Sequence, residues 1–138
     1  MSAKGYVYRV FDAADRLLYV GCSVDVESRL RYHEQHSFWW IFRSRVETEE
    51  FPSRAEAAEA EVAAIGSEHP RWNKKDRTTP APDLSYERDI ALRYRALQQD
   101  ERELIAELRR TRMALAGVSA EIAVVTGGGF EVDMSDIA

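Results

Sequence analysis

The chain has 138 residues, of which 45% are hydrophobic and 31% charged, and this composition is typical of a globular protein rather than a disordered chain. No run approaches the roughly 18 consecutive apolar residues of a membrane span, and Met1 leads directly into a strand-like segment, so we expect neither membrane association nor a signal peptide. The net charge of −5 does not point to a nucleic-acid-binding protein, and the single cysteine, Cys22, excludes an intrachain disulfide and favours a cytoplasmic location.

Two short apolar runs open the chain, at residues 6–11 and 16–21, and the four residues between them predict a β-hairpin. If the hairpin pairs residue 11 with residue 16, Tyr8 lies directly opposite Tyr19 and the two phenols share one face of the sheet. Aromatic pairs of this kind also stabilise sheets that have no catalytic role. The hairpin alone does not decide between these two readings.

Helix and strand signals alternate in the next part of the chain. Ser23 offers an N-cap for a helix that should extend to about residue 35. The aromatic run 38–42 precedes a strand expected at Arg43–Phe51, and we expect its rings to pack in the core, with stacking on nucleic-acid bases as the alternative. A helix rich in Ala and Glu follows over Arg54–Ser67.

The composition divides the chain into a module at residues 1–76, a Pro-containing linker at 77–83 and a helical tail at 84–138 with a flexible acidic C-terminus. The tail should form a long helix to about Ala114, end it at Gly117 and resume as a short helix. A helix-turn-helix is rejected, because residues 128–138 contain acidic but no basic side chains and phosphate would repel them. Two roles remain for the tail: covering apolar surface of the module, or forming a homodimer through its helix.

Four further residues carry side chains suited to chemistry on a phosphate. Arg29 and His33 lie four apart on the first predicted helix and therefore on one helical face. Glu61 borders the apolar stripe of the second helix, and Asn73 lies in the loop that follows it. Each of them also has an ordinary interpretation, as a solvated arginine, a surface carboxylate or a loop asparagine. Their joint spacing is the informative feature.

This spacing resembles that of the GIY-YIG nuclease family over about residues 5–75. The first motif reads Tyr6-Val7-Tyr8 in place of Gly-Ile-Tyr, and the second reads Tyr19-Val20-Gly21 in place of Tyr-Ile-Gly. Tyr6 is a departure, and its bulk is expected to alter substrate access. The remaining matches are Arg29 eight residues after Gly21, His33 one turn later, Glu61 four residues before an isoleucine, and Asn73 at the end of a Pro-x-x-Asn sequence.

The resemblance implies an α/β (α+β) fold, in which a small three-stranded antiparallel sheet is flanked by helices and followed here by the helical tail. It also implies a metal-dependent endonuclease that hydrolyses DNA phosphodiester bonds by a tyrosine-assisted attack of water. Glu61 would be the single protein ligand of one Mg²⁺ or Mn²⁺ ion, and Arg29 would bind the scissile phosphate. The alternative is a catalytically silent module that binds nucleic acid or protein and has kept the fold.

The same resemblance assigns roles to the other site residues. Tyr8 or Tyr19 would take the proton from the attacking water, His33 would tune that tyrosine or relay its proton, and Asn73 would hold the loop behind the site. A phenol with an ordinary pKa near 10 is almost entirely protonated at neutral pH, so nearby cations would have to favour the phenolate. Cys22 stands where some relatives have a lysine, and we therefore expect an alkaline optimum.

Overall fold

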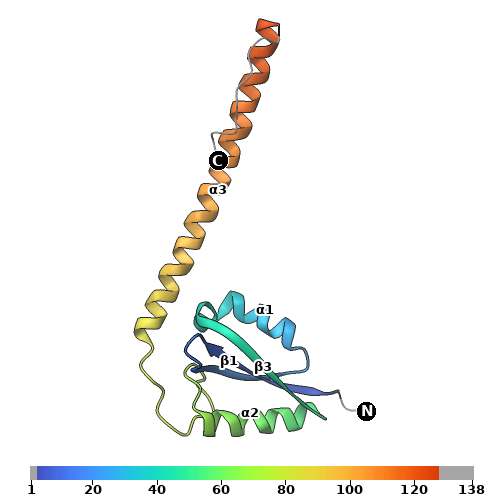
Figure 1. Ribbon diagram of the computed structural model, residues 1–138, viewed down its shortest axis with the longest axis vertical. Helices are drawn as coiled ribbons and strands as arrows, with labels where there is room; N and C mark the ends of the chain where they lie inside the picture. Colours follow the sequence, from blue (N-terminus) through green and yellow to red (C-terminus); the bar gives the residue numbers. More distant parts are fainter. Residues whose placement is uncertain (1–2, 128–138) are drawn as a thin grey trace. The chain divides into compact units, whose positions relative to one another are not determined.

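The computed structural model describes residues 3–127, and the chain divides into two compact units after Leu92 (Figure 1). The first unit is built on a three-stranded antiparallel sheet with strand order β2-β1-β3. Its strands are β1 (Gly5–Asp12), β2 (Leu17–Ser23) and β3 (Arg43–Phe51). The helices α1 (Val26–His36) and α2 (Arg54–Glu68) complete the small α/β fold that the sequence predicts.

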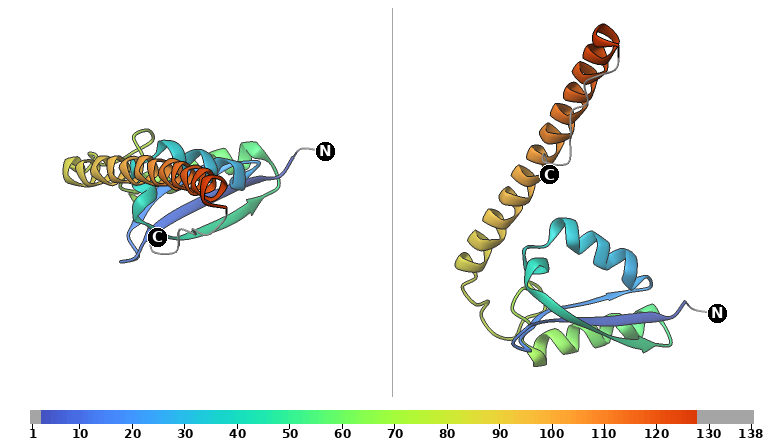
Figure 2. Two further views of the ribbon diagram at one scale, coloured as in Figure 1. Left: turned by 90° about the horizontal axis from the view of Figure 1, so that it is seen from above. Right: turned by 45° about the horizontal axis from the view of Figure 1, so that its top comes forward.

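The sheet separates two small hydrophobic cores, because successive strand residues face opposite sides. Figure 1 and the right-hand view of Figure 2 show α1 on one side of the sheet and α2 on the other. On the α2 side, Val7 and Val20 pack against α2, with Ala57, Ala64 and Ile65 buried in that core. On the α1 side, the buried residues are Tyr8, Val10, Leu18 and Trp39. The candidate catalytic tyrosines therefore belong to the α1 side.

The hairpin register differs from the one expected from the sequence. Val10, not Tyr8, lies opposite Tyr19, and Tyr8 lies opposite Gly21. The register shifts beyond Val10 and Leu18 is left out of the ladder, a local irregularity that regular alternation of side chains does not reveal. Because the error is two residues and the side-chain period is also two, Tyr8 and Tyr19 still share one face, as diagonal rather than direct neighbours.

One local expectation near α1, the N-cap residue, is corrected. Asp25 rather than Ser23 is the N-cap, since its carboxylate accepts a hydrogen bond from the backbone N–H of Ser28, whereas the Ser23 hydroxyl bonds to the backbone of Asp25. The aromatic run forms a 3₁₀ helix, η1 (Phe38–Phe42), and its Trp39 is buried in the core as expected. Strand β3 begins directly after it.

The segment after α2 returns to the sheet. The backbone N–H groups of Arg71 and Trp72 donate to the carbonyls of Leu17 and Leu18 on β2. Further along, Leu84 and Ala91 are buried, and Arg71 forms a 2.6 Å ion pair with Glu87. Residues 77–92 thus belong to the first unit of the structure. The domain boundaries at residues 76 and 83 that composition suggested stay a prediction.

The second unit is the remainder of the long helix α3 (Ser85–Thr126). Gly117 does not end this helix, contrary to expectation, because a helical glycine costs only about 1 kcal/mol relative to alanine. The helix ends instead before Gly127, which adopts a left-handed φ of 71°. The acidic segment 128–138 lies outside the described residues. Among residues 3–127, no helix has the length and apolar character needed to cross a membrane.

Candidate active site

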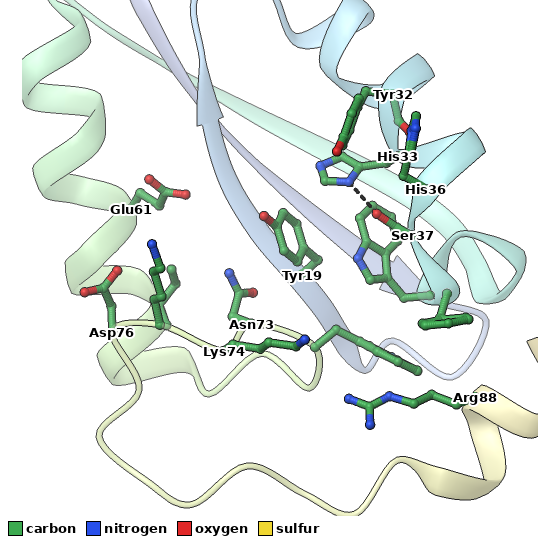
Figure 3. Close-up of a pocket in the computed structure, with 15 residues that line it drawn as sticks. Tyr19, Tyr32, His33, His36, Ser37, Glu61, Asn73, Lys74, Asp76 and Arg88 are labelled. Atoms are coloured by element: carbon green, nitrogen blue, oxygen red, sulfur yellow. Dashed lines mark hydrogen bonds between the residues drawn. The ribbon is translucent and has the colours of Figure 1, made fainter.

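A groove of about 770 Å³ in the first unit collects side chains from β2, α1, α2 and the loop after α2 (Figure 3). Four of the six site residues predicted from the sequence line it: Tyr19, His33, Glu61 and Asn73. Tyr8 and Arg29 lie beside the groove without lining it. The fold therefore brings together predicted site residues up to 54 positions apart in the sequence.

Tyr8 is sealed inside the module. Its hydroxyl is 2.8 Å from His33 Nε2, and His33 Nδ1 is 2.6 Å from the Ser37 hydroxyl. The ring lies over Gly21, where a Cβ atom would come within 2.3 Å of the Tyr8 hydroxyl. This close approach explains the glycine of the second motif: any side chain at position 21 would displace the tyrosine.

Tyr19 lies between the core and the groove. Its ring stacks on Trp39 at a centroid distance of 5.0 Å and an interplanar angle of 18°, and it meets the His33 ring edge at 4.9 Å. The Tyr8 and Tyr19 rings are 6.2 Å apart. Tyr19 is only partly buried and lines the groove, so of the two candidate catalytic tyrosines it is the one accessible from the groove.

Burial dominates the proton equilibria of this cluster. It raises the pKa of Tyr8 and of Tyr19 above the ordinary value, and this effect outweighs the opposite influence of the Arg29 guanidinium. Burial, reinforced by Arg29 and His36, lowers the pKa of His33 to about 4. Near neutral pH the cluster therefore consists of two phenols and an uncharged imidazole, with Arg29 as the cation beside them.

Arg29 is an exposed residue of α1 whose guanidinium interacts with the side chains of Tyr8 and Tyr19. Its guanidinium lies 4.7 Å from the centroid of the Tyr32 ring, a cation–π contact, and it forms no ion pair with the residues described. Several other arginines of the unit do form ion pairs; Arg9, for example, contacts Glu49 and Glu68. The positive charge of Arg29 thus remains available for an anion.

Glu61 faces the groove from α2 (Figure 3), and it is hydrogen-bonded to Cys22 on β2. The thiol donates a 2.9 Å hydrogen bond to Glu61 Oε2. Burial and the carboxylate raise the pKa of Cys22 to about 11, so the thiol keeps its proton and remains a donor. This contact fixes one oxygen of the carboxylate.

The residues around Glu61 fit a hard cation held by one protein ligand. Glu61 is partly buried, and within residues 3–127 it takes part in no ion pair, nor does any cluster of three His, Cys, Asp or Glu side chains form a metal site. A closed site for a softer metal is therefore not formed by this part of the chain. Mg²⁺ commonly binds through one or two carboxylates and fills its other positions with water and phosphate oxygens.

Asn73 acts on the backbone of β2. Its Oδ1 accepts from the Val20 N–H at 2.9 Å, and its Nδ2 donates to the Val20 carbonyl at 2.8 Å. One buried amide thereby occupies both hydrogen-bonding groups at the outer edge of the strand, next to Tyr19. The sequence located this residue, and the structure shows the two bonds by which it holds the loop.

Tyr6, which stands in place of the glycine of the first family motif, lies outside the groove. Its hydroxyl donates to the Glu50 carboxylate at 3.3 Å, toward β3. The close approach to a helix is instead made by Gly5, where a Cβ atom would lie 2.7 Å from that of Ala57 on α2. The Tyr6 side chain thus extends toward Glu50 on β3 and does not line the groove.

Sequence reasoning missed several residues of the groove. Tyr32 and His36 follow Arg29 by three and seven positions, so their helical spacing could have placed them on the same face of α1. Lys74, Lys75 and Arg88 lie on the loop after Asn73 and on the first turn of α3, and no periodicity indicates that these segments border the site.

The geometry agrees with the comparison with protein families. The family model described as GIY-YIG catalytic domain matches residues 4–76, more than half of the chain. The chain belongs to the GIY-YIG family, whose members are generally endonucleases. No curated protein and no solved structure compared with the chain gives a significant match.

Proposed function

We propose that this chain is a divalent-metal-dependent endonuclease that hydrolyses DNA phosphodiester bonds. The observation that carries the proposal is the convergence of Glu61, Tyr19 and Asn73 on one groove from α2, β2 and a loop. A carboxylate with no ion-pair partner in residues 3–127 and a reachable phenol are suited to binding a metal and to handling a proton. The unpaired Arg29 beside them supplies the charge that a phosphate requires.

Two residues bind the charged partners in this proposal. Glu61, whose carboxylate also accepts a hydrogen bond from Cys22, would hold Mg²⁺ or Mn²⁺, and water would complete the ion's shell. Bound there, the ion supplies charge stabilisation at the phosphate. Arg29 binds the phosphate oxygens, and its planar guanidinium stabilises the additional negative charge of the transition state. The Tyr32 ring supports the guanidinium from one side.

Tyr19 is the proposed general base. It lines the groove, whereas Tyr8 is sealed under β2 and hydrogen-bonded to His33. The Tyr19 phenolate would take the proton of the attacking water, and the Tyr8–His33–Ser37 chain would hold the rings beside it in place. The phenolate of any tyrosine becomes more populated as pH rises. Because burial raises the pKa of Tyr19, this increase falls at higher pH than for an exposed tyrosine, and activity should increase toward alkaline pH.

The test is cleavage of supercoiled plasmid DNA by the purified full chain with Mg²⁺, with Mn²⁺ and with EDTA. We expect nicked or linear product in the two metal samples only, and Glu61→Gln should reduce the rate by at least about 100-fold while DNA binding persists. Glu59→Gln is the matched control, since Glu59 is an exposed carboxylate on the same helix. Glu56 is unsuitable because it accepts a bond from the N-cap Ser53.

Two results would contradict the proposal. Cleavage that persists in Glu61→Gln and is lost in Glu59→Gln would show that the metal ligand is misplaced. Binding without cleavage in either metal would instead identify the chain as a silent binding module.

We also propose that the protein is cytoplasmic and that it forms a homodimer through α3. Cys22 keeps its proton and forms no disulfide, as a thiol of the reducing cytoplasm does. The part of α3 beyond Leu92 exposes Leu97, Leu104 and Leu108 in one groove along the helix, and a second copy of this helix would cover them.

A further inference from the structure

The groove that Glu61 lines has one side with basic residues and one side with aromatic rings. Three cations line it from the loop after Asn73 and from the start of α3, namely Lys74, Lys75 and Arg88. Aromatic rings line it from α1, η1 and the same loop, namely Tyr32, His36, Phe38 and Trp72. Figure 3 shows Arg88 and Lys74 on the side of the loop and Tyr32 and His36 on the side of α1.

The three cations form no ion pair within the described part of the chain. Cations elsewhere on the unit do: Lys4 pairs with Glu50 at 2.6 Å, and Arg31 with Glu27 at 3.5 Å. Two carboxylates, Glu61 and Asp76, also line the groove, so its formal charge is close to balanced. A protein of net charge −5 nevertheless places unpaired positive groups along one side of its candidate site.

The rings on α1 form a column of planar groups. The Tyr32 and His36 rings stack at 4.1 Å with an interplanar angle of 14°, and Arg29 lies over Tyr32 at 4.7 Å. Arg29 precedes Tyr32 by three residues and His36 follows it by four, so helix geometry places them on opposite faces of the phenol. His36 Nδ1 lies 2.8 Å from the backbone carbonyl of Tyr32, and this contact fixes the orientation of the His36 ring. Tyr32 remains 48% exposed.

We propose that this groove binds a single-stranded segment of DNA. Its phosphates lie along Lys74, Lys75 and Arg88, and an unpaired base extends the ring column at His36. Proteins that bind single strands combine these two features, a basic track for the backbone and rings on which bases stack. Bases inside a duplex are already stacked on their neighbours and cannot reach the column. The inference rests on the proposed function only in placing the cut within this groove, at Glu61 and Tyr19, so the preferred substrate is DNA with an unpaired strand.

The first experiment measures binding without cleavage. The full chain carrying Glu61→Gln is titrated, in EDTA, against a fluorescein-labelled 15-nucleotide strand and against the blunt duplex of the same sequence. Fluorescence anisotropy should give at least about tenfold tighter binding of the single strand, which is the effect of one to two stacked bases. Equal or tighter binding of the duplex, or no binding of either, would overturn the inference.

Matched variants separate the two sides of the groove. Lys75→Gln and Arg88→Gln should each reduce the salt dependence of single-strand binding by about 0.7 in log–log slope, because each removes one phosphate contact. His36→Ala should weaken single-strand binding by about fivefold or more and leave duplex binding unchanged. The controls are Lys4→Gln, a cation outside the groove, and Tyr86→Ala, a 73% exposed ring outside it. Equal effects of test and control variants would contradict the assignment.

The two proposals fail in different ways. Tight single-strand binding without cleavage of single-stranded or plasmid DNA in Mg²⁺ or Mn²⁺ would refute the nuclease and leave the groove assignment intact. Metal-dependent plasmid cleavage without a preference for the single strand would do the reverse.

Discussion

His33 carries a pH dependence that belongs to a single side chain. It is buried between Tyr8 and Ser37, and its pKa falls to about 4 from the ordinary value of about 6.5. The unfolded chain therefore takes up a proton at a higher pH than the folded chain does. The stability that the neutral imidazole contributes is complete above about pH 6.5 and is lost as pH falls from there toward 4.

This effect is measurable by urea unfolding at several pH values between 7.5 and 4.5. The midpoint of the wild-type chain should fall with pH, and His33→Gln should show a shallower fall because it removes the titrating group. His36→Gln, a change at an exposed histidine on the same helix, should keep most of the wild-type fall, because burial, the larger cause of the lowered pKa of His33, is unchanged. A His33→Gln profile parallel to that of the wild type would show that other groups cause the acid sensitivity.

Residue by residue, the sequence identified the chemical groups better than their surroundings. Tyr19 and Glu61, which the resemblance to the family motifs selects, line one groove, and Tyr8 lies beside it; their catalytic roles stay predictions. The pKa values could not be inferred, since they depend on burial: the sequence argument had Arg29 favouring the phenolate, whereas burial of both tyrosines outweighs it. Tyr32 and His36 went unnoticed because an exposed ring on a helix is ordinary.

At the scale of elements, Asn73 joins a loop to a strand. Asn73→Ala would leave the N–H and carbonyl of Val20 without the partners they have now, in a buried position. Leaving buried polar groups unsatisfied costs about 1–3 kcal/mol each, so we expect a loss of at least about 2 kcal/mol in the free energy of unfolding. Urea unfolding measures the loss, and amide exchange at Val20 should accelerate in the variant.

Lys74→Ala supplies the control for this change. Lys74 is the exposed neighbour of Asn73 in the same loop, and its replacement should leave the unfolding free energy within about 0.5 kcal/mol of the wild type. If both variants are equally stable, the amide does not hold β2.

The elements themselves were largely predictable. The bounds of β3 and α2 follow from Pro52 and from the N-cap Ser53, which acts locally. The errors arise where two local signals compete or where a distant contact decides. Asp25 outcompetes Ser23 as a cap two residues later, and η1 forms where an aromatic run alone suggests only burial. The bulge at Leu18 has no sequence signature, and it shifts the hairpin register.

At the scale of the whole molecule, the distal part of α3 is expected to join two chains. Leu97 and Leu104 lie one heptad apart, with Leu108 on the adjoining seam. Light scattering of the full chain should give the mass of a dimer, and Leu104→Glu should give a monomer. The control is Met113→Glu, whose side chain is 76% exposed and lies off the seam. A monomeric wild-type chain would contradict the proposed homodimer.

A truncated chain tests whether the module functions without the distal helix. The truncation should follow Leu92 and not Asp76, because Leu84, Ala91 and the Arg71–Glu87 ion pair contribute to the first unit. We expect this shorter chain to be monomeric and to retain cleavage per folded molecule. Loss of cleavage in a folded, truncated chain would assign the distal helix a role in catalysis.

The two edges of the sheet have a consequence for aggregation. An unpaired strand edge can template the addition of a strand from another molecule. On β2 that edge is occupied by the backbone of Arg71 and Trp72 and by the amide of Asn73. On β3, the other outer strand, charged side chains of both signs are exposed along the length, at Arg43, Arg45, Glu47, Glu49 and Glu50. Removing the Asn73 amide would therefore expose a strand on which fibrils could nucleate, and the same asparagine that braces the candidate site would also keep the sheet from growing.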